Sequence, residues 1–78
     1  MNCRIRPNLA AATECVDNCD CVVILAKDQL PQILCCNEEV FERVKRILKC
    51  GQSHIHEGYP LLRLNHQYNI VNRLRREE

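Results

Sequence analysis

The segment from Glu38 to Cys50 carries the local signals of an amphipathic helix, and it limits how this chain can fold more than any other feature. Asn37 is a good N-cap, and Glu38 and Glu39 suit the positive end of the helix dipole. The apolar side chains of the segment fall on one stripe: Val40, Phe41, Val44, Ile47 and Leu48. Such a helix is stable only when another apolar surface covers its stripe, so the rest of the chain must supply that surface.

Two short apolar runs precede this helix and are candidates for that surface. Residues 21–26 form an unbroken aliphatic run, and residues 30–36 form a second one after a polar break. Runs of this length that are rich in β-branched residues are typical of buried strands, with Pro31 at the start or on the edge of its strand. After the central helix, residues 54–64 favour extended structure, and residues 66–76 predict a final amphipathic helix.

The predicted fold class is therefore α+β, with a small sheet or β-hairpin packed by two amphipathic helices. A further short helix over residues 8–17, capped by Asn8, precedes the first run. No linker, low-complexity tract or clean repeat interrupts the chain, so residues 1–78 are expected to form a single small domain.

The alternative is an all-α fold, and it rests on a resemblance to ankyrin repeats. The matching positions run from a Pro-Leu opening to the glycine after a second helix: Pro31, Leu34, Cys35, Cys36, Val44, Ile47, Leu48 and Gly51. The residues from Gly58 to Leu61 resemble the opening of a next repeat, with Tyr59 where ankyrin repeats usually have threonine. This resemblance implies stacked helix pairs that bind proteins.

The chain has 78 residues, seven of them cysteine and only three aromatic, so its core must be thin, aliphatic and rich in thiols. Domains of this size usually need a metal, disulfides, a partner or a second copy for stability. We therefore expect a non-enzymatic interaction or regulatory module that binds a protein partner and forms a homodimer. The expected partner-binding residues are the apolar ones of the last two helices: Phe41, Val44, Leu48, Ile70, Val71 and Leu74.

The charge distribution gives an alternative function, which is nucleic-acid binding. From residue 43 to residue 76 the chain has eight basic residues and one acidic residue, Glu57, although the net charge is only +1. A basic surface attracts phosphate backbones, whereas charges of both signs at helical spacing are typical of a solvated helix face. The candidate contact residues are Arg43, Lys45, Arg46, Lys49, Arg63, Arg73, Arg75 and Arg76.

The seven cysteines raise the question of their oxidation state. Their number is odd, the first residues contain no apolar stretch of a signal peptide, and the chain has too few glycines and prolines for a loop-rich disulfide scaffold. We therefore expect reduced thiols and an intracellular location, cytoplasmic or nuclear. Most of these thiols are expected to pack like small apolar side chains.

A second alternative is a small zinc-stabilised domain. Cys19 and Cys21, and likewise His54 and His56, have the alternating spacing that places two side chains on one face of a strand. Two thiolates and two imidazoles suit a closed tetrahedral zinc site, although the usual Cys-x2-Cys knuckle is absent from the sequence. The primary expectation is that no cofactor is bound.

Catalytic motifs are absent from the sequence, so an enzyme is not expected. No nucleophile elbow, phosphate-binding glycine loop or paired carboxylates occur. The vicinal thiols of Cys35 and Cys36 precede a helix whose dipole could lower the pKa of a thiol, but the negative charges of Glu38 and Glu39 oppose this effect.

The longest apolar run has six residues, so we expect no transmembrane helix.

Overall fold

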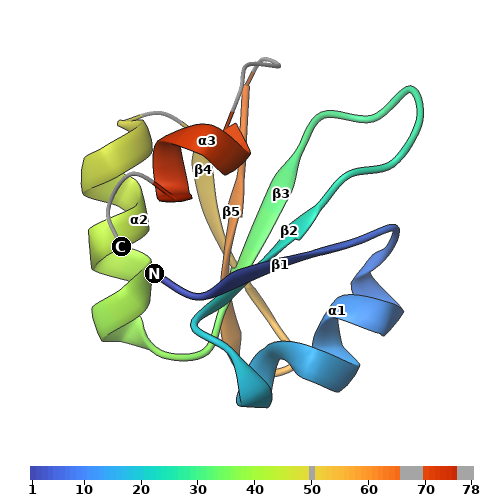
Figure 1. Ribbon diagram of the computed structural model, residues 1–78, viewed down its shortest axis with the longest axis horizontal. Coiled ribbons are helices and arrows are strands. Elements are labelled where there is room, and N and C mark those ends of the chain that lie inside the picture. The colour runs from blue at the N-terminus through green and yellow to red at the C-terminus, as the bar shows by residue number, and fades with distance from the viewer. Residues whose placement is uncertain (50, 66–69, 76–78) are drawn as a thin grey trace.

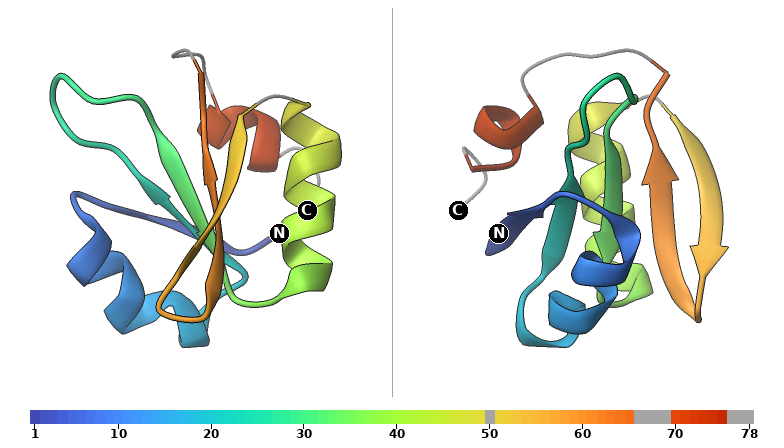
Figure 2. Two further views of the ribbon diagram at one scale, coloured as in Figure 1. Left: turned by 180° about the vertical axis from the view of Figure 1, so that it is seen from behind. Right: turned by 90° about the vertical axis from the view of Figure 1, so that its right-hand side faces the viewer.

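Five short strands form one mixed sheet, and helices pack on both of its faces (Figures 1 and 2). The computed structural model describes residues 1–49, 51–65 and 70–75. The elements are, in chain order, β1 (Cys3–Arg6), α1 (Leu9–Cys15), the short 3-10 helix η1 (Val16–Asn18), β2 (Cys21–Ile24), β3 (Gln32–Cys35), α2 (Glu38–Leu48), β4 (Gln52–His56), β5 (Tyr59–Arg63) and α3 (Ile70–Arg75).

The strand order in the sheet is β1-β2-β3-β5-β4. β1 runs parallel to β2, and all the other neighbouring strands are antiparallel. The parallel pair is joined through α1, which crosses one face of the sheet, as Figure 2 shows. The two edge strands of the sheet are therefore β1, near the N-terminus, and β4, which pairs with β5.

The two faces of the central strands are covered by different helices. Val22, Leu34 and Leu61 belong to a buried cluster with Ala12 of α1 and Val16 of η1. On the opposite face, a second and larger cluster joins the strands to α2 and α3, and its members include Val23, Ile33, Leu62, Phe41, Val44, Ile70 and Leu74. Because both faces are buried, β2 is apolar at every position, which explains the unbroken run in the sequence.

The α2 helix begins where its sequence predicts. The side chain of Asn37 accepts a hydrogen bond from the main-chain N–H of Val40 at 2.9 Å. The helix ends at its C-cap Lys49, which has the left-handed conformation with a φ of +60°. A glycine is needed at Gly51, because its φ is +115° and a Cβ there would lie 2.6 Å from the main-chain oxygen of Arg63.

A tight hairpin joins β4 to β5. Glu57 and Gly58 both have positive φ, as a two-residue hairpin turn requires, and His56 pairs with Tyr59 at its base. The Tyr59 hydroxyl donates a hydrogen bond of 2.7 Å to Asp17 of η1. This hydrogen bond is the largest cause of the raised pKa of Tyr59. It ties the hairpin to η1 on the face of the sheet that α1 covers.

The α+β prediction is confirmed, and the all-α alternative is wrong. Residues 21–24 and 32–35 pair with each other as antiparallel strands, and the segment that resembles the opening of a second ankyrin repeat is strand β5. The resemblance failed because a short apolar run carries no periodicity that separates a helix from a strand. The residues 66–69 of the expected final helix lie outside the described part, and α3 covers its later turns.

No helix in the described part of the chain is long and apolar enough to cross a bilayer.

Candidate functional site

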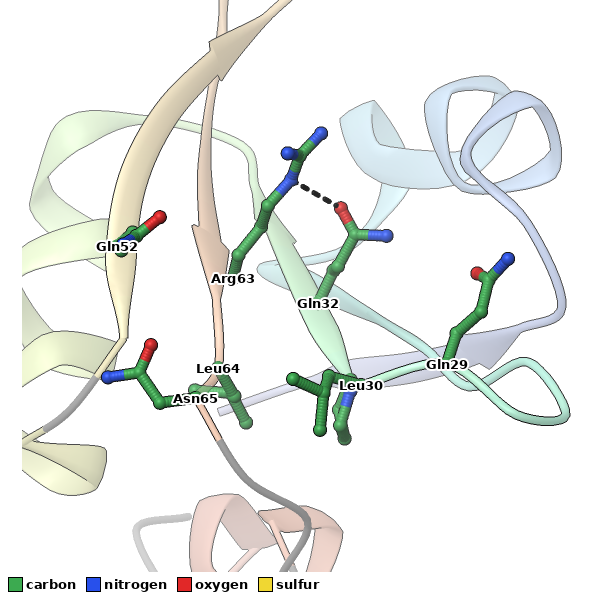
Figure 3. A pocket seen from close by; sticks show the side chains of 8 residues that line it. Gln29, Leu30, Gln32, Gln52, Arg63, Leu64 and Asn65 are labelled. Atoms are coloured by element: carbon green, nitrogen blue, oxygen red, sulfur yellow. Dashed lines mark hydrogen bonds between the residues drawn. The ribbon is translucent and has the colours of Figure 1, made fainter.

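A concavity in the described part of the chain lies where β3 and β4 begin and β5 ends, beside the β2–β3 connection (Figure 3). It has a volume of about 410 Å³. We call it the Arg63 pocket, and its lining residues are Gln29, Leu30, Pro31, Gln32, Gln52, Arg63, Leu64 and Asn65.

Sheet register brings the polar centre of this pocket together. Arg63 on β5 is paired with Gln32 on one side and with Gln52 on the other, so three neighbouring strands place these side chains in one row. The Arg63 Nε donates a hydrogen bond of 3.2 Å to Oε1 of Gln32, which fixes the orientation of the guanidinium group (Figure 3). The two terminal nitrogens of Arg63 form no hydrogen bond or ion pair with any other residue that the structure describes.

The Arg63 pocket combines polar and apolar side chains. Four carboxamide side chains surround the single guanidinium, and they offer both donors and acceptors. Leu30 adds an apolar rim, with 48% of its surface exposed. Among its described lining residues there is no carboxylate, thiol, hydroxyl, imidazole or amine.

The six residues expected to bind a partner lie elsewhere, inside the molecule. Phe41, Val44, Leu48, Ile70 and Leu74 are at most 5% exposed, and they pack in the cluster between the sheet and the helices α2 and α3. Val71 is half-buried at the margin of the same cluster. The structure therefore brings all six together, but as core residues that offer no continuous outer surface in the folded chain.

The basic candidates that the structure describes lie on different parts of the molecule. Four of them lie on α2 or at its C-terminal cap: Arg43, Lys45, Arg46 and Lys49. Lys45 forms an ion pair with Glu42 at 2.9 Å. Arg73 donates to the main-chain oxygen of Ile47 and so covers the end of α2. Arg63 projects from the opposite face of the sheet, the face on which α1 packs. The side chain of Arg75, and Arg76 as a whole, lie outside the described part.

The four zinc candidates are also separated. Cys21 forms a disulfide and is no longer a thiolate ligand. His54 and His56 lie on β4, three strands away from β2, or about 14 Å at the usual strand spacing. The buried Nε2 of His54 has no hydrogen-bond partner in the described part of the chain, but the residues described there contain no group of three potential ligands.

A disulfide joins Cys3 of β1 to Cys21 of β2. The expectation that all cysteines are reduced is therefore wrong for this pair, because the parallel register places the two residues directly opposite, with Cα atoms 4.6 Å apart. Cys15, Cys19, Cys35 and Cys36 are free thiols, and Cys50 lies outside the described residues. The intracellular location, which rested in part on reduced thiols, stays a prediction.

The vicinal thiols are not activated. Burial raises the pKa of Cys35 to about 12, and the neighbouring Cys36 and Glu38 raise it further. Burial also raises the pKa of Cys36, and burial with the nearby Cys15 raises the pKa of Cys19 to about 11. These three thiols stay protonated at neutral pH, so they do not have the low pKa of a reactive cysteine.

These shifts predict that the protein loses stability in alkaline solution. A thiol with a raised pKa keeps its proton in the folded state after the unfolded chain has lost it, so the free energy of unfolding falls as the pH rises from about 9 towards 12. Each fully shifted thiol contributes a slope of up to about 1.4 kcal/mol per pH unit. Urea unfolding at a series of pH values measures this slope. The Cys35→Ala variant should show a shallower one, and an equal slope in both proteins would contradict the assignment to Cys35.

Comparisons with known proteins gave no relative: no family model, no curated protein and no solved structure matches this chain.

The sequence did not reveal the Arg63 pocket. Its central row consists of residues 32, 52 and 63, which only the pairing of three strands brings together. The sequence does place Gln32 and Gln52 at the starts of strands. Their proximity to Arg63 can be recognised only when the strand register is known.

Proposed function

We propose that this protein is a small non-enzymatic interaction and regulatory module that binds a protein partner and also associates with itself. The observation that supports the proposal is the Arg63 pocket, in which an oriented guanidinium stands among carboxamides beside an exposed leucine. This combination suits a segment of another polypeptide, since carboxamides bind main-chain amide groups and an apolar rim binds a side chain.

The guanidinium makes an acidic segment the best ligand for this pocket. A carboxylate can receive two parallel N–H bonds from the terminal nitrogens of an arginine, while Nε remains bonded to Gln32. The lining residues that the structure describes include no acidic group that would repel a carboxylate. We therefore propose that an aspartate or glutamate side chain of the partner enters the pocket.

The Arg63→Gln variant tests this proposal. We expect it to bind acidic peptides about ten-fold to a hundred-fold more weakly than the unmodified protein, because a hydrogen-bonded charge pair contributes about 1.5–3 kcal/mol. The probe is a set of short peptides with a central Asp or Glu, compared with the same peptides carrying Asn or Gln, and binding is measured by fluorescence anisotropy. Arg43→Gln on the exposed face of α2 removes the same charge without touching the pocket, and it should bind as the unmodified protein does.

Two results would contradict the proposal. If Arg43→Gln weakens peptide binding as much as Arg63→Gln, general charge and not the pocket is responsible. If the protein ignores the peptides and instead binds RNA or DNA oligonucleotides with a steep salt dependence, the nucleic-acid alternative replaces the proposal.

A further inference from the structure

We propose that β4 is the self-association surface, and that two copies pair antiparallel through their β4 strands to form one continuous sheet. This inference rests on the self-association part of the proposed function and names the surface and the register that produce it. Figure 2 shows β4 at the outer edge of the sheet, beyond β5.

The main-chain groups that face outward on β4 follow from the neighbouring strand. The N–H of Leu64 donates to the oxygen of Pro31 beside β3, so the even-numbered residues of β5 bond to β3. Because main-chain groups alternate along a strand, the odd-numbered residues of β5 bond to β4, where their partners are Gln52, His54 and His56. The N–H and C=O groups of Ser53 and Ile55 therefore point away from the sheet. In the described part of the chain these N–H and C=O groups form no hydrogen bond.

The two edges of the sheet differ in how they are protected. β1 carries Arg4 and Arg6, and charged side chains on an edge strand discourage pairing between copies. β4 has the sequence Gln-Ser-His-Ile-His, with no lysine, arginine, acidic residue or proline. Ile55 is also 68% exposed, the largest exposure among the large apolar side chains that the structure describes. The edge that lacks protective residues is thus also the edge that exposes an apolar side chain.

The outward-facing groups of β4 are complementary to those of a second copy. In the antiparallel register centred on His54, Ser53 of each copy lies opposite Ile55 of the other. Both are outward-facing residues, so each such pair exchanges two hydrogen bonds and the interface gains four. If the register is shifted by two residues, either Ser53 lies opposite Glu57 or Ile55 lies opposite Gly51. Glu57 and Gly51 have positive φ and lie outside the strand. The His54 register is therefore the one that uses all outward groups, and it brings no like charges together when the histidines are neutral.

The Ile55→Pro variant tests the role of the edge. Proline removes an N–H that the β4–β5 ladder does not use, and edge strands tolerate it, so the fold should persist while two of the four interface bonds are lost. We expect dimerisation to weaken by about ten-fold or more. Sedimentation equilibrium from low to high micromolar concentration measures the association, and far-UV circular dichroism with urea unfolding verifies the fold.

A pair of lysine variants supplies the matched control. Ile55→Lys leaves every main-chain group in place but adds a charge to β4, and it should also weaken dimerisation. Ile5→Lys adds the same charge to β1, where the isoleucine is 42% exposed, and it should leave dimerisation unchanged.

The His54→Cys variant tests the register. In the proposed dimer residue 54 lies opposite itself in a pair without hydrogen bonds, where Cα atoms are about 4.5 Å apart and a disulfide can form. Mild oxidation of His54→Cys should yield a covalent dimer joined through residue 54. Oxidation of Ser53→Cys, in which residue 53 lies opposite Ile55 of the other copy, should not.

The possible outcomes separate this inference from the proposed function. If the unmodified protein is a monomer at high micromolar concentration, both the β4 interface and the self-association part of the function are wrong. If it is a dimer that Ile55→Pro and Ile55→Lys leave intact, the β4 interface is wrong and self-association stands. Peptide binding at the Arg63 pocket is judged independently in either case.

Discussion

Reducing the disulfide between Cys3 and Cys21 is expected to lower the free energy of unfolding by about 3 kcal/mol. The bond closes a loop with a sequence separation of 18 residues, and it restricts the unfolded chain correspondingly. It also holds β1, an edge strand of four residues that pairs with β2. In a domain whose total stability is on the order of 5–15 kcal/mol, such a loss moves the unfolding transition far.

Urea unfolding of the oxidised protein, with and without a phosphine reductant, measures this effect. The Cys3→Ser variant serves as a reference, because it lacks the cross-link but keeps the buried Cys21. Measured in the presence of the reductant, its stability should resemble that of the reduced protein. Cys15→Ser is the matched control, since it replaces a free thiol and should leave the response to reductant intact. Identical transitions of the oxidised and reduced protein would show that the cross-link does not stabilise the fold.

The reference variant has to be kept reduced for a structural reason. Cys21 lies in register with Cys3 on one side and with Cys35 on the other. The Cys36 N–H donates a hydrogen bond to the main-chain oxygen of Asp20. The next pair along these antiparallel strands, Cys21 with Cys35, is therefore a non-hydrogen-bonded pair, the type in which opposite side chains lie closest. Oxidation of Cys3→Ser could therefore join Cys21 to Cys35 and replace one cross-link by another.

The local part of the fold could be read from the sequence because its signals are local. The start of α2 is set by Asn37 and its stripe by residues three and four positions apart, and both were predicted correctly. The strands β2 and β3 were recognisable as apolar runs because the sheet is buried on both faces. These features depend on a few consecutive residues and not on the topology.

The remaining features depend on pairings between distant residues. β1 was missed because Arg4 and Arg6 make a weakly apolar strand, although Cys3 and Ile5 do alternate with them. The Cys3–Cys21 bond follows from the parallel position of β1, and the Arg63 pocket follows from the register of three strands. The amphipathic stripes of α2 and α3 showed that these faces are covered, but not that the chain's own sheet covers them.

This last distinction has a large measurable consequence at Phe41. The side chain is 5% exposed and packs in the cluster between α2 and the sheet, with the Lys45 ammonium 4.8 Å from the centre of its ring. If Phe41 belonged to a partner-binding surface, Phe41→Ala would fold normally and fail only to associate. As a core residue it should instead lower the free energy of unfolding by about 3–5 kcal/mol, because the ring's burial is lost and a cavity remains.

Urea unfolding monitored by circular dichroism, at a protein concentration where the chain is monomeric, decides between these two roles. Phe41→Leu is the first control, because it keeps most of the volume and should cost less than about 1.5 kcal/mol. Ile55→Ala is the second, because it removes an exposed side chain from β4 and should change the free energy of unfolding by less than about 0.5 kcal/mol while weakening association. A Phe41→Ala protein as stable as the unmodified chain would contradict the core assignment and return the apolar face of α2 to the candidates for partner binding.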